Sequence, residues 1–222
     1  MSDPWAFGWT QLLTIVGFLI TGAIAIGGFG TFERWRKQKL EEKKIEIAFE
    51  ALAIGYECQF VFGSIRNPGT LGYEYEDMPR AGVTEEEWRR RGPFYAILKR
   101  INENRPYFIK VLQLQPRVMT MFGPETEAVF RKLNEARAHV TVSAQMLMRP
   151  IDQDRQWNEQ ARNLHAQCEA DIWEGLGEMA PNGDRVTGKL NEFRDGLVRL
   201  CRPIVDREFG LEEGWWSRLR GR

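Results

Sequence analysis

The residues best suited to metal chemistry are two histidines and three cysteines in a chain of 222 residues. His165 and Cys168 are three positions apart, so a helix over this stretch places both side chains on one face. Cys201 and His139 fall on neighbouring predicted helices and would complete four ligands for zinc or a haem iron. Structural zinc sites usually contain closely spaced pairs such as Cys-x-x-Cys, and the sequence has no such pair. We therefore expect no metal and no other cofactor, with these four residues as the candidates to test.

The cysteines also bear on nucleophilic chemistry and on disulfide bonds. Cys58, Cys168 and Cys201 all fall on apolar stripes, where a thiol behaves as a small buried hydrophobic group. Three widely spaced cysteines exclude a disulfide-stapled secreted scaffold. The sequence also lacks the Gly-x-Ser-x-Gly motif that presents a nucleophilic serine. No covalent catalyst is therefore indicated.

Two carboxylates, Glu50 and Glu57, are seven positions apart and project from the same side of a predicted helix. Such a pair could act as acid and base or hold a metal. Carboxylate-bridged metal bundles also need Glu-x-x-His on two helices, which this sequence lacks. We favour ion pairs between these glutamates and Arg or Lys from a neighbouring helix.

The glycine-rich segment Gly27-Gly-Phe-Gly30 is a third possible site, because glycine-rich turns bind phosphates. No lysine follows at the P-loop spacing, so phosphate binding is not indicated. The segment is either a hinge or a glycine cluster of the kind that membrane helices tolerate, and we favour the cluster.

The element that must carry this glycine segment is a predicted transmembrane helix over residues 9–32. No charged residue occurs from Pro4 to Phe32. At about 1.5 Å per residue, a helix of this length crosses the roughly 30 Å hydrocarbon core. Trp5, Trp9 and Trp35 lie near its two ends, where indole rings favour the headgroup layer. A cleavable signal peptide would need a basic amino terminus, and Asp3 is the only charge before the run.

Orientation follows from the basic stalk over residues 33–44, which holds six Lys or Arg against three Glu. Its first basic residues, next to the span, are Arg34, Arg36, Lys37 and Lys39. Basic flanks stay in the cytoplasm, so residues 1–8 should be extracytoplasmic and the remainder cytoplasmic. This layout resembles that of many bacterial inner-membrane proteins, which implies a location and no activity.

Small residues at Gly17, Thr21, Ala25 and Gly28 are spaced four, four and three apart. Such a stripe lets two membrane helices approach closely, so it is a candidate face for self-association.

Residues 45–210 read as an antiparallel helical bundle. The first helix should run to about Asn67, with a stripe of Ile45, Phe49, Leu52, Tyr56 and Phe60. Further apolar residues widen that stripe until little polar face remains: Ala48, Ala51, Ile54, Cys58, Val61 and Phe62. The later helices should begin at Thr84, Pro93, Pro106, Pro124, Asp152 or Asp154, and after the turn Pro181–Asp184.

Two segments have no assigned role in that bundle. Residues 67–92 form its longest irregular stretch, which is either functional or mobile. The tail, residues 211–222, carries Trp215, Trp216, Arg218 and Arg220. These side chains suit a membrane interface, a protein-binding surface or simple packing on the bundle, and the sequence does not separate the three.

The fold class expected is therefore all-α, with one amino-terminal membrane helix and a cytoplasmic bundle. Equal numbers of acidic and basic residues, 31 of each, argue against a nucleic-acid partner. The leading hypothesis is a non-enzymatic interaction or scaffold module at the membrane, with the bilayer and a protein partner or a second copy as its contacts. One alternative is a sensor that binds a small ligand between its helices. Another is an enzyme whose site the sequence does not reveal.

Overall fold

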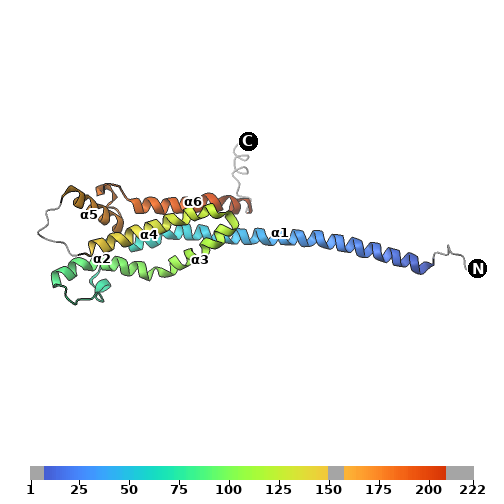
Figure 1. The fold of residues 1–222 in the computed structure, drawn as a ribbon, viewed down its shortest axis with the longest axis horizontal. Helices are drawn as coiled ribbons and strands as arrows, with labels where there is room; N and C mark the ends of the chain where they lie inside the picture. Colours follow the sequence, from blue (N-terminus) through green and yellow to red (C-terminus); the bar gives the residue numbers. More distant parts are fainter. Residues whose placement is uncertain (1–7, 150–157, 209–222) are drawn as a thin grey trace, which may run out of the picture. The chain divides into compact units, whose positions relative to one another are not determined.

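In the computed structural model the chain is helical, with no strand among the residues described (Figure 1). The structure describes residues 8–149 and 158–208, except the side chains at positions 10, 25–27, 29, 30 and 208. The α-helices are α1 (Trp9–Ile65), α2 (Glu85–Glu103), α3 (Arg105–Phe122), α4 (Glu127–Leu147), α5 (Glu159–Ile172) and α6 (Arg185–Glu208). Short 3-10 helices lie at η1 (Gly72–Tyr75), η2 (Pro124–Thr126) and η3 (Gly177–Met179). The all-α prediction is confirmed.

The chain divides into two units, residues 1–46 and residues 47–222, and α1 contributes to both. The described part of the first unit is helical from Trp9 onward, and the helix continues through Gly27–Gly30 without a break. Within the part of the chain that the structure describes, no helix has both the length and the apolar character of a membrane span. The span expected over residues 9–32 is therefore not supported by this structure.

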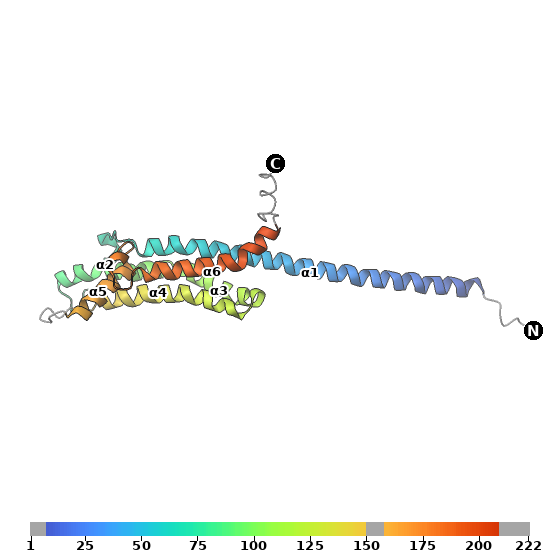
Figure 2. The same cartoon turned by 90° about the horizontal axis from the view of Figure 1, so that it is seen from above.

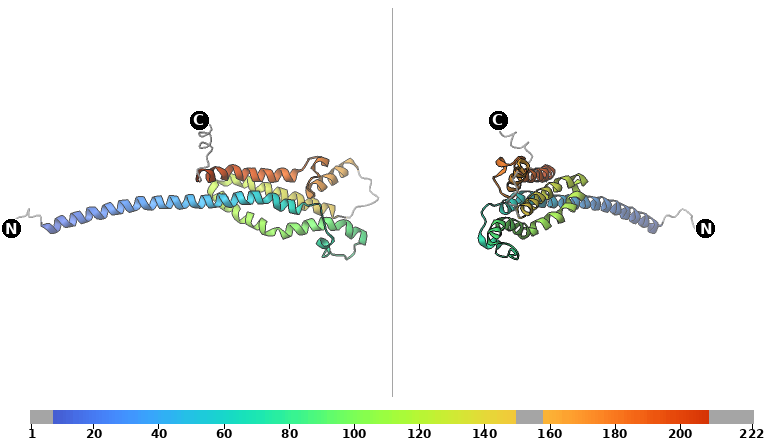
Figure 3. Two further views of the ribbon diagram at one scale, coloured as in Figure 1. Left: turned by 180° about the vertical axis from the view of Figure 1, so that it is seen from behind. Right: turned by 60° about the vertical axis from the view of Figure 1, so that its left-hand side comes forward.

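The second unit is a bundle in which residues 47–65 of α1 pack with α3, α4 and α6 (Figures 2 and 3). Hydrogen bonds from Gln59 to Asn191 and from Arg66 to Thr187 show that α1 and α6 are antiparallel. Two ion pairs, Glu50 with Arg117 and Glu57 with Lys110, show the same for α1 and α3. The expected antiparallel packing is present in these helix pairs.

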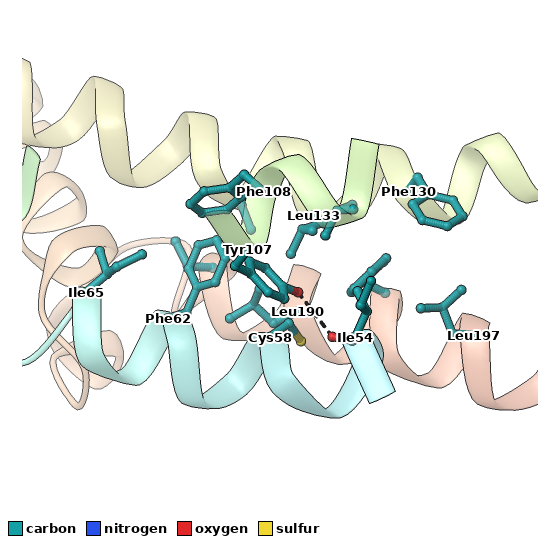
Figure 4. Packing of buried hydrophobic residues seen from close by; sticks show 14 of the residues in the cluster. Ile54, Cys58, Phe62, Ile65, Tyr107, Phe108, Phe130, Leu133, Leu190 and Leu197 are labelled. Atoms are coloured by element: carbon teal, nitrogen blue, oxygen red, sulfur yellow. Dashed lines mark hydrogen bonds between the residues drawn. The ribbon is translucent and has the colours of Figure 1, made fainter. Parts of the chain in front are cut away.

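The core of this bundle is apolar and contains large aromatic side chains (Figure 4). Phe62 of α1 meets Phe108 of α3 edge to face, at 6.1 Å between ring centres. Phe130 and Phe193 make a similar contact between α4 and α6 at 5.8 Å. The buried hydroxyl of Tyr107 donates to the carbonyl of Ile54 at 3.1 Å, so its one polar group is satisfied.

The buried face of α1 differs from the stripe expected for it. Phe49, Tyr56 and Phe60 are exposed, at 44%, 46% and 80% of their surface. Leu52 of that stripe is buried, as are most of the residues expected to widen it, and the buried set is Ile47, Ala48, Ala51, Leu52, Ile54, Cys58, Phe62 and Ile65. The lack of a side chain at Gly55 helps to explain which face of α1 is buried, because a β-carbon added there would lie 3.3 Å from the Leu197 side chain. The helix turns Gly55 to α6, and this orientation leaves Phe49, Tyr56 and Phe60 exposed, whereas Phe62 is buried.

Two predicted helix limits were wrong. Thr84 caps α2 as expected, accepting from the Glu87 amide at 3.2 Å, but α2 continues through Pro93 to Glu103. An interior proline costs about 3 kcal/mol. Continuing the helix buries Ala96, Ile97 and Ile101, which offsets that cost.

The limits of α5 also differ from those expected. Asn158 caps this helix, accepting from the Ala161 amide at 2.8 Å, whereas Asp152 and Asp154 lie outside the described residues. The predicted stripe extended to Met179, but α5 ends at Ile172 and Met179 is 79% exposed. Trp173 ends the helix with an extended backbone, at φ −114° and ψ 125°, and Gly175 then adopts a left-handed conformation with a φ of +92°.

The segment 67–92, predicted to be irregular, is held in place by Arg100 of α2. Its guanidinium binds both carboxylate oxygens of Glu74, at 2.7 and 2.9 Å. The same group donates to the carbonyls of Asn67 and Gly69, each at 2.7 Å. One bidentate ion pair thus ties the end of α1 and the η1 turn to α2.

A second contact closes the segment around Trp88. The ring of Tyr75 lies 5.0 Å from Trp88, whose indole donates to the carbonyl of Met78 at 3.3 Å. The guanidinium of Arg80 stacks over the indole of Trp88, 4.1 Å from the ring centre. A β-carbon at Gly92 would lie 2.6 Å from the Tyr75 ring, so this contact depends on glycine.

We expect Gly92→Ala to destabilise the protein by about 1–3 kcal/mol, because the new methyl group must displace the Tyr75 ring. Chemical denaturation followed by circular dichroism measures this change. The matched control is Gly188→Ala on α6, where an added β-carbon meets nothing within 4 Å. That control should be neutral or stabilising by up to about 1 kcal/mol, and equal effects of the two substitutions would contradict the packing described.

Candidate functional site

The structure does not assemble the four candidate metal ligands into a site. Across residues 8–149 and 158–208, no group of three or more His, Cys, Asp or Glu side chains is arranged to hold a metal ion. His139 lies half-buried on α4, and His165 lies 3.5 Å from Glu169 on its own helix. Cys168 and Cys201 are in the core, on α5 and α6.

All three cysteines are buried, as their positions on apolar stripes predict, and none forms a disulfide bond in the structure. Burial raises the pKa of Cys58 to about 12 and that of Cys201 to about 11. Burial also raises the pKa of Cys168. Because the thiolate is the reactive form, these cysteines are poor nucleophiles at neutral pH.

The two carboxylates of α1, Glu50 and Glu57, are paired with cations of α3. Glu50 accepts from Arg117 at 2.6 Å, and Glu57 lies 3.8 Å from Lys110. This is the ion-pair arrangement favoured from the sequence. With each carboxylate facing its own cation, the pair has the geometry of two surface salt bridges.

The most elaborate polar cluster was not predicted, and its centre is Arg66 at the end of α1. This side chain is only 2% exposed. It donates to the backbone carbonyls of Asp171 and Ala170, at 2.9 and 2.7 Å. It also donates to Thr187 at 2.9 Å and forms an ion pair with Asp184 at 3.0 Å. One buried guanidinium therefore joins α1, the end of α5 and the start of α6.

Asp171, 1% exposed, extends this cluster on the other side of the α5 end. Its carboxylate accepts from Ser143 at 2.7 Å and from two guanidinium nitrogens of Arg185, at 2.9 and 2.6 Å. Gln167 adds a longer bond at 3.3 Å. Burial would raise the pKa of Asp171, but the hydrogen bonds from Arg185 and Ser143 outweigh it and hold the pKa below its usual value.

These bonds give the cluster a structural role. A buried charge is tolerated when it is paired and its remaining donors are bonded, and both conditions hold for Arg66 and Asp171. A sequence signal for it does exist. Arg66 lies at the end of an apolar helix, two positions before Pro68-Gly69. Asp184 stands just before α6 and caps it by accepting from the Thr187 amide at 2.9 Å.

The exposed aromatic side chains of α1 are the clearest surface candidate in the bundle. We define the aromatic strip as Phe49, Ala53, Tyr56 and Phe60, which share one face and are all exposed. Their spacing of four, three and four is that of a helix-packing seam. Ion pairs and hydrogen bonds from α3 and α6 border the strip, as an apolar contact surface with a polar rim requires.

The predicted membrane contacts lie in the first unit or outside the described residues. Trp9, Trp35 and the four basic residues Arg34, Arg36, Lys37 and Lys39 are exposed on α1. On the small-residue stripe, a β-carbon at Gly17 or Gly28 would meet nothing within 4 Å, and Thr21 is exposed. Trp5, the side chain of Ala25, and the tail residues Trp215, Trp216, Arg218 and Arg220 lie outside the described part.

We expect Arg66→Met to destabilise the bundle by about 3–5 kcal/mol, because it leaves Asp184 without its cation and the buried carbonyls of Ala170 and Asp171 without this donor. Urea unfolding of the full chain in detergent measures the loss. The control is Arg202→Met, which removes a mostly exposed pair with Asp206 and should cost at most about 1 kcal/mol. A small effect at Arg66 would contradict the structural role assigned to the cluster.

His139 gives a pH-dependent prediction. Its burial and the nearby Arg185 guanidinium hold the pKa of His139 below the usual value. The unfolded chain therefore binds this proton at a higher pH than the folded chain does, so stability declines as the pH falls below about 6.5. We expect His139→Gln to reduce that decline in unfolding free energies measured from pH 8 to pH 5. An unchanged slope would contradict the environment described.

Comparison with known proteins adds no identity: no protein family, no curated protein and no solved structure matches this chain. What the protein does must follow from its own side chains. Those that bear most directly on function are the apolar residues of 9–32, the basic stalk and the aromatic strip.

Proposed function

We propose that the protein is a membrane-anchored, non-enzymatic interaction module whose helical bundle faces the cytoplasm. Residues 9–32 form the anchor, residues 33–44 form a basic stalk, and the bundle carries the contact surfaces. The observation on which the proposal depends is a long run of exposed apolar side chains on α1.

The exposure of this run is unusual for a helix outside a membrane. Phe18 and Leu19 are 76% and 68% exposed, and the other large apolar side chains described between Trp9 and Ile24 are exposed as well. Contiguous apolar surface of this extent marks a membrane or protein contact. Residues 25–27, 29 and 30 lie outside the described side chains, so for them the anchor proposal relies on the sequence alone.

The polar groups within the run suit an apolar environment. The hydroxyl of Thr21 donates to the carbonyl of Gly17 at 2.8 Å, so it needs no water as a partner. The backbone around it is helical, which satisfies its amides and carbonyls internally. Both features lower the cost of placing this segment in lipid.

The charges after the run support a cytoplasmic bundle. Arg34, Arg36, Lys37 and Lys39 are exposed, which leaves them available to anionic headgroups. Positive residues next to a single span keep their side in the cytoplasm. A bacterial inner membrane, with residues 1–8 on the outer side, fits this distribution.

The interaction role is favoured by the way the bundle uses its reactive groups. Its thiols are buried, its paired carboxylates face cations, and its most buried charges hold helices together. The exposed aromatic strip, by contrast, has the composition of a protein-binding surface. A homodimer through the Gly17–Gly28 stripe would present two bundles side by side at the membrane.

Ile20→Arg tests the anchor. A charged residue in the middle of a span costs about 2.5–3.5 kcal/mol, so we expect much of this variant to leave the membrane fraction on alkaline washing. The control is Leu40→Arg, an exposed stalk position outside the apolar run, which should remain bound. Release of the unmodified protein by alkali, or equal retention of the two variants, would contradict the anchor.

Chemical cross-linking in the same native membranes tests the interaction role. We expect one reproducible protein partner, or a contact between copies, identified by mass spectrometry. Its loss in Ile20→Arg would show that the contact depends on membrane location. A protein retained in the membrane without any reproducible contact would contradict the interaction role while leaving the anchor intact.

A further inference from the structure

The aromatic strip of α1 is an apolar surface on a bundle that otherwise buries its large aromatic side chains. Tyr56 and Phe60 are its most exposed aromatic residues, at 46% and 80%. Neither contributes to the core, whose residues on this helix lie on the opposite side. Exposed aromatic groups one turn apart are typical of a surface that another segment covers.

The position at which α6 ends identifies a covering segment. The side chain of Leu197 lies 3.3 Å from the β-carbon position of Gly55, and the two helices are antiparallel. Eight residues further along α6 and eight back along α1 bring Val205 to the level of Ile47, and both are core residues. The described part of α6 therefore ends at Glu208, beside the amino-terminal end of the strip.

The residues that follow Glu208 can reach the strip and have the composition to cover it. Trp215 lies seven positions after Glu208, and a chain of that length spans up to about 23 Å when extended. By helical rise, Phe60 lies about 24 Å along α1 from the level of Glu208, and Tyr56 lies nearer, at about 18 Å. The segment 209–222 contains Trp215 and Trp216 followed by three arginines.

The charge beside the strip also fits this segment. Glu57 borders Tyr56 and Phe60, and its carboxylate is 3.8 Å from Lys110, a loose pair that is partly exposed. Such a carboxylate can accept a further hydrogen bond from an arginine. Arg218 follows the tryptophans by two positions, so the tail places a basic group close to its apolar pair, as α1 places Glu57 beside Tyr56 and Phe60.

We propose that residues 209–222 fold back on α1, with Trp215 and Trp216 packed on Tyr56 and Phe60 and Arg218 beside Glu57. A tethered segment faces its site at an effective concentration of the order of millimolar, which a second copy does not reach in solution. The tail is thus an internal occupant of the surface on which a protein partner would bind. This inference goes beyond the membrane-anchored interaction module and does not depend on the anchor.

Cysteine cross-linking in the full chain tests the proposal. In Tyr56→Cys with Trp215→Cys, mild oxidation should form a disulfide within one chain at least about tenfold faster than in the control. The control pairs Trp215→Cys with Leu112→Cys. Leu112 is 56% exposed on α3 and lies at the same level of the bundle, because Lys110 pairs with Glu57. The distance to be covered along the bundle axis is then similar, and the native cysteines are buried in both.

A second measurement does not require the disulfide. The thiol of Phe60→Cys should be alkylated several times more slowly in the otherwise unchanged chain than in one that also carries Trp215→Ala and Trp216→Ala. Both readouts are made in detergent and again with anionic vesicles. Cross-links between chains would show that a second copy covers the strip. Equal rates in all variants, or tail protection only with vesicles, would also overturn the proposal.

Discussion

The bundle depends on one buried cation. Arg66 lies at the point where α1 ends, and its guanidinium binds the carbonyls that α5 leaves unpaired at its own end. The last carbonyls of a helix have no partner within it, so they are natural acceptors for a cation. Because Asp184 neutralises the same group while capping α6, the ends of three helices are fixed by one side chain. An apolar residue there could not bond these carbonyls, and they would be buried without donors.

That constraint explains how the rest of the bundle is arranged. With its end fixed against α5 and α6, α1 turns Gly55 toward α6 and packs closely against Leu197 there. The large aromatic side chains of α1 that lie on the other face then remain outside. The aromatic strip is thus a consequence of the same packing that forms the core, and it supplies the bundle with a surface suited to another protein segment.

The reactive groups described in this bundle lie apart from one another. His139, His165, Cys168 and Cys201 are on three helices, and each has a local environment that accounts for it. The cysteines pack as small apolar groups, and burial raises the pKa of each thiol. The carboxylates of α1 form ion pairs with α3. The charged groups described in the bundle are used mainly to position helices.

Local signals in the sequence determined the fold class and many helix limits. Proline at the first helical positions predicted the starts near Pro106 and Pro124, and Thr84 predicted a cap, because these effects act within one turn. The absence of charge over residues 9–32 is also a property of the sequence alone, and the anchor proposed there remains to be tested.

Tertiary structure decided what depends on neighbours distant in the chain. The close packing of Gly55 against Leu197 determines which face of α1 is buried. The sequence does not reveal this, because α1 has apolar residues on both faces. The continuation of α2 depended on the packing of Ala96, and α5 ended at the extended backbone of Trp173. Arg66 and Asp184 are far apart in the sequence, and only the folded chain brings their charges together. Helix formation depends on residues within a few positions of one another, so the sequence predicts it. Side-chain burial and ion pairing depend on residues far apart in the chain, so only the tertiary structure decides them.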